Sequence, residues 1–342
     1  MTLSSDGIRL SVLDRSRTRE GEDGSQALRD TVRLAQRVEE LGYHRFWVSE
    51  HHSVPGVAGS APTVLAAAVA GATSAIRVGT GGVMLPNHQP MVVAEQFGVL
   101  ESLFPGRIDM GLGRSVGFTD GIRRALGRDR DDAERFGEQL TELLGWFTGT
   151  QTAHPQVHAR PAEGLRVPAY VLAIGEGASI AAVAGLPLVV GDLRGRERML
   201  SAIDAYRSAF RPSAWAREPY VVVSGTVAVA GSEEAARRLL IPEAWSLAYS
   251  RTRGVFPPLT PAERVEELTM TEKQRGFFES GLRGHVYGTE EQVGEALERV
   301  VKESGAQEVL VTTSTYDRAA LLDSYRRLAR VAGMAGPADA EG

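Results

Sequence analysis

Three adjacent titratable residues, Glu50, His51 and His52, follow the apolar run RFWVS, which is typical of a buried strand. A carboxylate beside two imidazoles suggests metal binding or proton exchange with a bound ligand. Side chains of an extended segment alternate in direction, so His51 and His52 do not converge easily on one ion. The chain has no cysteine and no HExxH motif to complete a metal site. We therefore expect no metal, and a proton-transfer role competes with simple hydrogen bonding to loops.

Glycine-rich segments follow two other strand-like runs. In GTGG, residues 79–82, the missing Cβ atoms allow either a bulge or tight turn in the barrel wall or the close approach of a flat ligand ring. In GEGAS, residues 175–179, backbone amides at the start of a helix could bind a phosphate, although Glu176 is an unfavourable neighbour for an anion. Arg114, after another strand-like run, could pair with the same phosphate or be an ordinary surface arginine.

The composition of the whole chain limits the function further. Of its 342 residues, 43% are apolar and 24% are charged, the balance of a globular protein with a sizeable core. The formal net charge of -5 argues against nucleic acid or an anionic membrane as a partner. The absence of cysteine excludes disulfides and thiolate nucleophiles. The N-terminus lacks a signal-peptide pattern, and the apolar run at 62–72 is too short to span a bilayer, so we expect a cytoplasmic protein.

Strand-like and helix-like segments alternate along the chain. The strand-like runs are residues 8–13, 45–49, 76–85, 107–113, 169–173, 186–191, 220–230 and 308–313. The helix-like segments are residues 25–41, 61–73, 91–103, 133–147, 179–185, 196–210, 290–304 and 317–331. Such alternation predicts an α/β protein with parallel strands, as an open doubly wound sheet or a (β/α)8 barrel. About eight units without a linker favour the TIM barrel, whose site lies at the C-terminal ends of the strands.

Long intervals between these elements predict loop insertions over the C-terminal mouth of the barrel. The insertions are residues 114–132, 148–168 and 241–287, and we expect the last to be an excursion over one barrel face. We predict a single barrel domain over residues 1–333. Residues 334–342, AGPADAEG with the preceding methionine, predict a disordered tail.

The segments FWVSEHH, IRVGTGGVMLPNHQPMVVAEQF and LFPGRIDMGLGR, in this order and spacing, carry a family resemblance. The chain resembles the bacterial luciferase-like flavin-dependent monooxygenases, especially the single-chain type of actinobacterial secondary metabolism. The resemblance is close in the first third of the chain and weaker towards its end. It implies a (β/α)8 barrel, and it implies reduced FMN (FMNH2) and dioxygen as co-substrates, with a flavin C4a-hydroperoxide as the oxidant. It also implies a separate flavin reductase, a homodimer and a medium-sized organic substrate.

The resemblance also implies roles for individual residues. His51 matches the catalytic imidazole, whereas His52, on the opposite side of the strand, is expected to be structural. Gly81 and Gly82 match a pair that forms a cis peptide beside the flavin ring, and Arg114 matches an arginine that reaches the flavin phosphate. The remaining residues expected at the phosphate follow the fifth strand: Gly175, Glu176, Gly177 and Ser179.

Two departures from the family pattern leave alternatives open. Relatives usually carry a Gly-Ser-Ser turn where this chain has Gly175 to Gly177, and often a His-His-Phe segment where it has Gly191, Asp192 and Leu193. Both departures fall on the phosphate side of the expected site. The alternatives are therefore an F420-dependent oxidoreductase that transfers hydride without oxygen, and a non-catalytic protein that binds flavin or another ligand. Loss of activity without oxygen would distinguish the first alternative from a monooxygenase.

Overall fold

The fold is a closed barrel of eight parallel strands in a computed structural model that describes residues 8–173, 176–191 and 195–334. The barrel strands are β1 (Arg9–Asp14), β2 (Arg45–Val48), β3 (Arg77–Thr80), β5 (Ile108–Gly113), β6 (Ala169–Leu172), β7 (Leu188–Val190), β8 (Val221–Gly225) and β11 (Glu308–Val311). Strand β1 pairs with both β2 and β11, and the pairing of β3 with β5 completes the ring. The predicted (β/α)8 architecture is confirmed.

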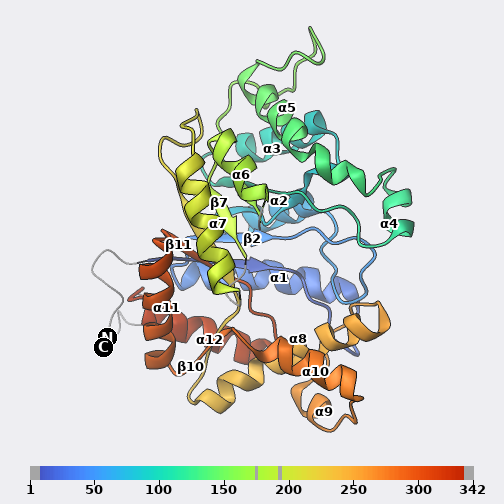
Figure 1. Cartoon of the computed structure of the whole chain (residues 1–342), viewed down its shortest axis with the longest axis vertical. Helices are drawn as coiled ribbons and strands as arrows, with labels where there is room; N and C mark the ends of the chain where they lie inside the picture. The colour runs from blue at the N-terminus through green and yellow to red at the C-terminus, as the bar shows by residue number, and fades with distance from the viewer. Residues whose placement is uncertain (1–7, 174–175, 192–194, 335–342) are drawn as a thin grey trace.

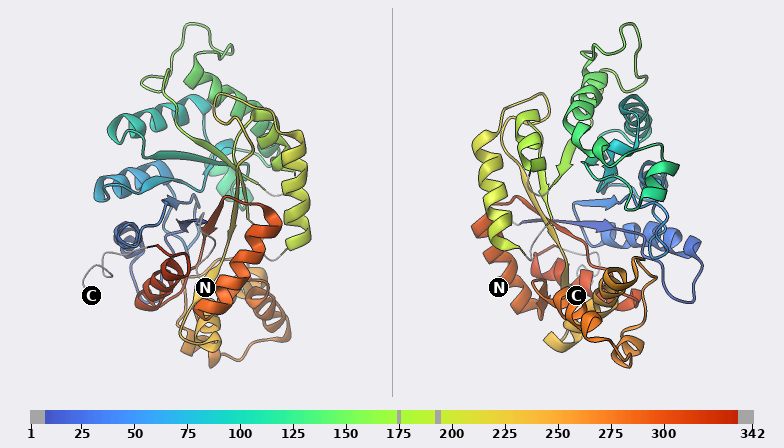
Figure 2. Two further views of the ribbon diagram at one scale, coloured as in Figure 1. Left: turned by 90° about the vertical axis from the view of Figure 1, so that its left-hand side faces the viewer. Right: turned by 45° about the vertical axis from the view of Figure 1, so that its right-hand side comes forward.

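Helices surround the strands on the outside of the barrel (Figures 1 and 2). The helices of the repeating units are α1 (Gly24–Glu40), α2 (Pro62–Ala72), α3 (Pro90–Leu103), α5 (Phe136–Thr148), α6 (Glu176–Ala184), α7 (Arg196–Ala209), α11 (Glu290–Ser304) and α12 (Arg318–Val331). Their bounds follow from local signals. Thr289 forms a capping box with Gln292 at the start of α11, and Gly305, at φ 57°, ends that helix in the left-handed conformation.

The predicted strand over residues 76–85 is two strands. Strand β3 ends at Thr80, and β4 (Val83–Met84) resumes the pairing with β5. Gly79 pairs with Asp109 and Val83 with Leu112, so three residues of one strand face two of the other. This is a β-bulge, which re-aims a strand and is common at barrel rims. Residues 80–82 therefore form an irregular step at the mouth.

The predicted strand over residues 220–230 also divides. Strand β8 stays in the barrel and ends at Gly225, whereas β9 (Val227–Val229) leaves it. Strand β9 pairs in parallel with β10 (Val286–Gly288), which belongs to the long insertion. Both halves are buried and rich in valine, so apolar periodicity alone cannot reveal that the chain changes sheet.

The insertions contain helices of their own. Helix α4 (Asp120–Ala125) and the 3-10 turn η2 (Asp131–Arg135) follow β5, whereas α8 (Glu233–Arg253), α9 (Ala262–Glu266) and α10 (Glu272–Leu282) separate β9 from β10. Ile241, where we expected the excursion to begin, lies inside α8, and α8 packs on α10. Figure 1 shows α4 above and α8 to α10 below the right-hand side of the barrel. Of the predicted tail, only Met334 is described; residues 335–342 lie outside the described part of the chain.

The barrel interior has a charged base and an apolar middle. Arg45, Arg77, Asp109 and Glu308 lie at or next to the N-terminal starts of their strands and are linked by ion pairs of 2.7 Å. Above them, an apolar layer fills the barrel: Leu13, Trp47, Tyr170, Val189, Val222 and Leu310. A larger apolar core lies between the strands and the surrounding helices. Within the described residues, no helix is both long and apolar enough to cross a membrane.

Candidate active site

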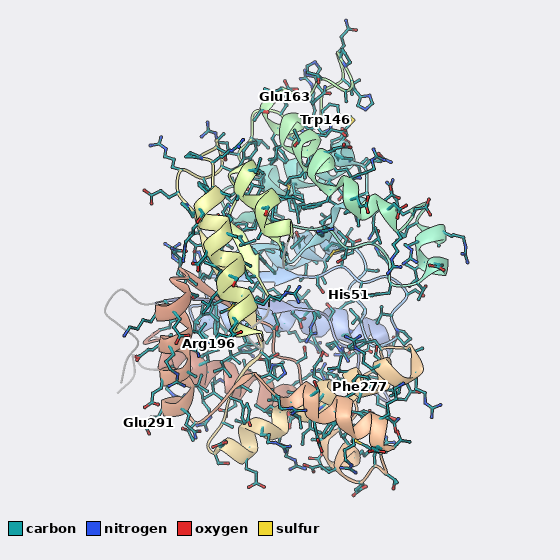
Figure 3. The ribbon with its side chains drawn as sticks, in the orientation of Figure 1. His51, Trp146, Glu163, Arg196, Phe277 and Glu291 are labelled. Atoms are coloured by element: carbon teal, nitrogen blue, oxygen red, sulfur yellow. The ribbon has the colours of Figure 1, made fainter. Side chains whose placement is uncertain are left out.

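His51 lies in the loop after β2, at the C-terminal mouth of the barrel. Its backbone N–H donates to Gly59 O at 2.8 Å, and its Nδ1 lies 3.1 Å from Ser49 Oγ. Its ring stacks on Phe118 from the insertion after β5, with centroids 6.1 Å apart and an interplanar angle of 18°. Figure 3 shows His51 between the α4 region above and the α8 to α10 region below. The imidazole is therefore fixed by backbone and ring contacts from two separate loops.

His51 is a neutral imidazole at neutral pH. Burial, followed by the positive charges of Arg15 and Arg17, lowers the pKa of His51 from 6.5 to about 4, against the smaller opposing effects of Glu50 and Glu243. A neutral imidazole has a free lone pair and can accept a proton. The site therefore keeps His51 in the form that a proton acceptor needs.

Glu50 anchors the mouth by accepting from several groups at once. Its Oε2 accepts from Met84 N–H at 2.9 Å and lies 2.9 Å from His88 Nε2. Its Oε1 accepts from Asn87 Nδ2 at 3.0 Å and lies 2.8 Å from His52 Nε2. Burial raises the pKa of Glu50, but these hydrogen bonds outweigh burial and the net pKa is lowered. The ionised carboxylate thus ties the chain that follows the bulge to the β2 loop, and His52 contacts this carboxylate.

A pair of arginines, Arg15 and Arg17, faces the same mouth from the loop after β1. Glu243 of α8 lies 3.0 Å from Arg15 Nη1 and 3.6 Å from Arg17 Nη1. Arg17 Nη2 donates to Ser246 Oγ at 2.8 Å, and its guanidinium lies 5.1 Å from the ring centroid of Phe256. Burial raises the pKa of Glu243, but the two guanidiniums outweigh burial and lower it. Our sequence analysis missed this cluster.

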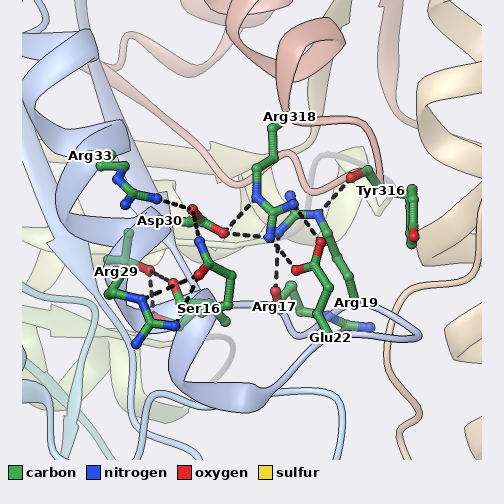
Figure 4. A network of polar contacts seen from close by, with 12 residues as sticks. Ser16, Arg17, Arg19, Glu22, Arg29, Asp30, Arg33, Tyr316 and Arg318 are labelled. Atoms are coloured by element: carbon green, nitrogen blue, oxygen red, sulfur yellow. Dashed lines mark hydrogen bonds and ion pairs between the residues drawn. The ribbon is translucent and has the colours of Figure 1, made fainter.

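The loop that carries the two arginines is held by a second polar network (Figure 4). Arg19 Nε donates to Tyr316 O at 2.6 Å, and its Nη1 donates to Arg17 O at 3.4 Å. Arg318 of α12 pairs with Glu22 and with Asp30 of α1. These contacts join the loop to the first and last helices of the barrel, so Arg15 and Arg17 sit on a rigid support.

Two neighbouring cavities open at this mouth. The larger, of about 770 Å³, is lined by His51, the two arginines, polar groups and apolar side chains that include Val54, Val57, Phe118, Ile122, Leu247 and Phe256. The smaller, of about 360 Å³, lies over the ends of β8 and β11 and is lined by residues that include Glu243, His285 and Thr226. Arg15, Leu247 and Phe256 line both. Together the cavities have the size and mixed polarity of a small-molecule site.

Gly81 and Gly82 lie in the bulge, and the peptide bond between them is cis. A Cβ on Gly81 would stand 2.7 Å from Leu13 Cδ1 and 3.2 Å from Trp47 Cε3. A Cβ on Gly82 would stand 2.8 Å from Gly111 O. Gly82 is therefore required by a backbone neighbour, whereas a Cβ on Gly81 would meet only side-chain atoms. The sequence alone suggested a ligand, a bulge or a tight turn.

Two of the residues expected at a phosphate lie side by side. A Cβ on Gly177, in the first turn of α6, would stand 3.8 Å from Cδ of Arg114, which follows β5. Ser179 is exposed and lines a groove between α5 and α6. Glu176 begins α6, whereas Gly175 and Asp192 lie outside the described residues. The structure thus brings Arg114 to Gly177 but directs Ser179 towards α5.

Some residues of the site were not predicted from the sequence, and they differ in whether a sequence pattern could have indicated them. Arg15 and Arg17 follow the first strand directly, so the rule that led to His51 would also have led to them. Glu243 and Phe118 come from insertions, where no periodic pattern fixes which side chains turn inward. No group of three or more potential metal ligands occurs in residues 8–173, 176–191 and 195–334.

Comparison with known proteins covers nearly the whole chain. The profile of the family described as luciferase-like monooxygenase matches residues 8–308. Protein YvbT of Bacillus subtilis (strain 168), itself uncharacterised, is 38% identical over 323 residues, which are 94% of this chain and 96% of that protein. A luciferase-like monooxygenase of Escherichia coli (strain K12) is 34% identical over 93% of this chain and 95% of its own length.

Solved structures agree with the barrel. Apo-MsnO8 matches with a TM-score of 0.84 and 28% identity, over 97% of this chain and 99% of its own. Two matches at 17% identity show the shared fold alone. One is the oxygenating constituent of 3,6-diketocamphane monooxygenase of Pseudomonas putida in complex with FMN, with a TM-score of 0.73 over 97% of this chain and 99% of that chain. The other is an F420-dependent secondary alcohol dehydrogenase with an F420–acetone adduct, with a TM-score of 0.70 over 95% and 99%.

The family profile spans most of the chain, and the curated relatives match it over nearly their full lengths. The chain belongs to the luciferase-like monooxygenase family.

Proposed function

We propose that the protein is a monooxygenase that uses FMNH2 and dioxygen to oxygenate a medium-sized organic molecule. The observation that carries the proposal is His51, a neutral imidazole that lines a cavity of about 770 Å³ at the mouth of a luciferase-like barrel. Reduced flavin, when bound, supplies the electrons that activate dioxygen. His51 accepts a proton from the reacting group and helps to position it.

The residues around the mouth fit a flavin mononucleotide. Arg114 lies beside Gly177 in the first turn of α6. Its guanidinium and the N-terminal amides of α6 are suited to bind a phosphate. Glu50, through its bonds to Met84 and His88, holds the rim next to Gly81 and Gly82, where the flat ring would lie. We include Gly175 and Glu176 in the phosphate region on the resemblance alone, whereas Ser179, which the resemblance also implies, lines the groove beside α5.

Helix α8 and the segment that follows it form one wall of the cavity. Leu247 and Ser250 come from the helix, and Val255 and Phe256 follow its end at Gly254. We propose that residues 241–287 restrict water access to the reacting group, because stray water and leaking intermediates reduce the yield of an oxygenation. Apolar side chains on this wall also suit the body of an organic substrate.

The proposal is tested by aerobic turnover with a separate FMN reductase, NADH, labelled dioxygen and a library of organic acids, esters and ketones. The expected result is a product heavier by one oxygen atom derived from dioxygen. His51→Ala should reduce turnover by about 10²–10⁴-fold, the usual contribution of a general base, while binding of FMN is retained. An equal product yield without oxygen would contradict the monooxygenase function.

An F420-dependent oxidoreductase is the second candidate. It is favoured by the fold match to the F420-dependent secondary alcohol dehydrogenase, whose TM-score of 0.70 is close to the 0.73 of the FMN complex. Titration with both cofactors distinguishes the candidates. Tight binding of F420 and no binding of FMN or FMNH2 at millimolar concentration would favour hydride transfer.

We also propose that the protein is a homodimer that receives FMNH2 from a reductase. Helices α2 and α3 expose large apolar side chains, with Val64 at 69%, Leu103 at 64% and both Val92 and Val99 at 47% exposure. A shared face of this kind is suited to a second copy of the chain. Sedimentation equilibrium should give twice the chain mass, and Val64→Glu with Leu103→Glu should give the monomer.

A further inference from the structure

The charged side chains that line the larger cavity are all positive. Three guanidiniums line it, those of Arg15, Arg17 and Arg251, and His51 is neutral. Among the lining residues that the structure describes there is no carboxylate. Glu243 lines the neighbouring smaller cavity instead. A cavity with surplus positive charge attracts an anion.

Arg17 is built into this cavity as a fixed donor. Its residue exposure is 4%, and its Nη2 donates to Ser246 Oγ at 2.8 Å and to Pro257 O at 3.2 Å. Its Cζ lies over the ring of Phe256, 5.1 Å from the centroid. These contacts fix the direction of the remaining N–H groups, so little side-chain entropy is lost when a ligand binds.

Unpaired polar atoms remain in the cluster. Nε of Arg15, Nε of Arg17 and Oε2 of Glu243 are buried, and none has a hydrogen-bond partner among the described residues. A buried donor without a partner costs free energy, so such groups in native structures usually await a ligand, a water or an ion. One carboxylate, Glu243, also balances only one of the two guanidinium charges. The cluster therefore lacks one negative charge, and its two Nε–H groups have no partner among the described residues, whereas Arg15 Nη2 donates to Thr312 O and Ser314 Oγ.

We infer that the substrate of this site carries a carboxylate, which pairs with Arg15 and Arg17 while its apolar body lies against Val57, Leu247 and Phe256. This inference names the substrate class and rests on the proposed monooxygenase function. A guanidinium offers two parallel N–H donors that match the two oxygens of a carboxylate. A neutral substrate would leave these buried donors unpaired, and such a site discriminates strongly against it.

The anchoring of the carboxylate also serves His51. The same two guanidiniums lower the pKa of His51, so a bound anion that neutralises them raises it towards the operating pH. A base acts best when its pKa is near that pH. The carboxylate therefore places the substrate beside His51 and makes His51 a better base only when substrate is present.

The test compares phenylbutyrate with phenylbutanol, which share an apolar body and differ in the carboxylate. Isothermal titration calorimetry of each probe with the full chain, with and without FMN, gives the ratio of the two dissociation constants. We expect the carboxylate to bind at least about tenfold more tightly, because hydrogen bonds to charged groups contribute that much. Arg17→Gln should bring the ratio close to one.

Two further variants complete the design. Arg15→Gln, at a partly exposed position, should also reduce the ratio of the dissociation constants. If circular dichroism shows that Arg17→Gln does not fold, Arg15→Gln alone tests the inference. Arg237→Gln removes the same charge from an exposed position of α8 outside the cavity and should leave the ratio unchanged.

Four results would overturn the inference. They are equal binding of the two probes, no binding of the carboxylate at millimolar concentration, an unchanged ratio in both arginine variants, and displacement of the carboxylate by FMN, because the arginines would then hold the cofactor. These measurements need no oxygen or turnover. If the protein is not a monooxygenase, the binding ratio can still be measured, so failure of that proposal is distinguishable from failure of the carboxylate inference.

Discussion

The base and the mouth of the barrel both contain buried arginines, but their charges are arranged differently. At the base, Arg45 and Arg77 face Asp109 and Glu308, so positive and negative charges are equal in number. The single carboxylate of Asp109 accepts hydrogen bonds from Arg45, Arg77 and the Trp47 indole. Glu308 accepts from Tyr220 Oη at 2.9 Å. Arg45 Nε makes no well-aligned hydrogen bond but lies 2.7 Å from Glu308 Oε1, so each charge at the base has its counter-charge.

At the mouth, Arg15 and Arg17 share one carboxylate, Glu243, and three polar atoms of the cluster have no partner within the described chain. Both regions bury charge, which is costly without compensation. Compensation at the base comes from the fold itself. Compensation at the mouth is incomplete, and a ligand that completes it gains binding free energy. Incomplete pairing thus distinguishes a binding site from a structural network.

The largest effect is expected at the base. Asp109→Ala leaves Arg45 and Arg77 without their shared counter-charge in the interior, so we expect a loss of about 3–5 kcal/mol in the free energy of unfolding. Urea denaturation followed by circular dichroism measures it. Arg17→Gln at the mouth should lose only about 1–2 kcal/mol, the value of a few hydrogen bonds. Equal losses in the two variants would mean that the mouth is a structural network too.

A smaller effect is expected at the rim. The Glu50 carboxylate accepts from Met84 and Asn87 and contacts two histidines. Glu50→Gln replaces this carboxylate by an amide, which has an N–H₂ donor of its own. We expect the free energy of unfolding to fall by about 1–3 kcal/mol, because at least one buried donor loses its acceptor. The same urea titration measures the loss. Glu40→Gln, which affects an exposed pair with Arg37, should change stability by less than about 0.5 kcal/mol.

Much of the barrel could be predicted from the sequence, but the charge network at its base and the arginine cluster at its mouth were not predicted. Alternating short strands and amphipathic helices specify the barrel, and the barrel specifies where strand ends meet, which led to His51 and Arg114. The glycines at residues 79–82 made a bulge one of the possibilities, but its position could not be fixed, because the apolar run continues through it without a change of period. The need for glycine at Gly82 was visible, but the neighbour that imposes it, Gly111, was not.

The features that could not be predicted from the sequence depend on contacts between distant segments. Glu243 meets Arg17 only because α8 crosses the mouth, and no local pattern in α8 indicates which of its residues turns inward. Arg15 and Arg17 were within reach of the strand-end rule, but without Glu243 and the cavity they read as ordinary loop arginines. Sequence patterns fix local elements well. Charge balance depends on which elements meet, and it becomes visible only in three dimensions.

The pH dependence of His51 sharpens the comparison further. The pKa of His51 is about 4 in the folded chain against an ordinary value of 6.5, so the unfolded chain binds the proton first as the pH falls. The contribution of His51 to stability is thus complete above pH 6.5 and is lost as the pH falls from 6.5 to about 4. Arg17→Gln removes one of the positive charges that lower this pKa and should raise it. Titration of the His51 ring signals by NMR, assigned with His51→Gln, measures the change, and an unchanged or lower pKa would contradict the assigned cause.

The smallest effect is expected for Glu243→Gln, and it has the opposite sign. Glu243 is among the charges that raise the pKa of His51, after burial and the two arginines that lower it, so its loss should lower that pKa slightly. The same change removes the one carboxylate that competes for Arg15 and Arg17, and phenylbutyrate should bind more tightly by a few fold. NMR titration and calorimetry measure the two shifts in one variant. A rise in the pKa of His51 together with weaker carboxylate binding would mean that Glu243 holds the arginines in place for the ligand, and the mouth would then resemble the base, with its charges paired for structure.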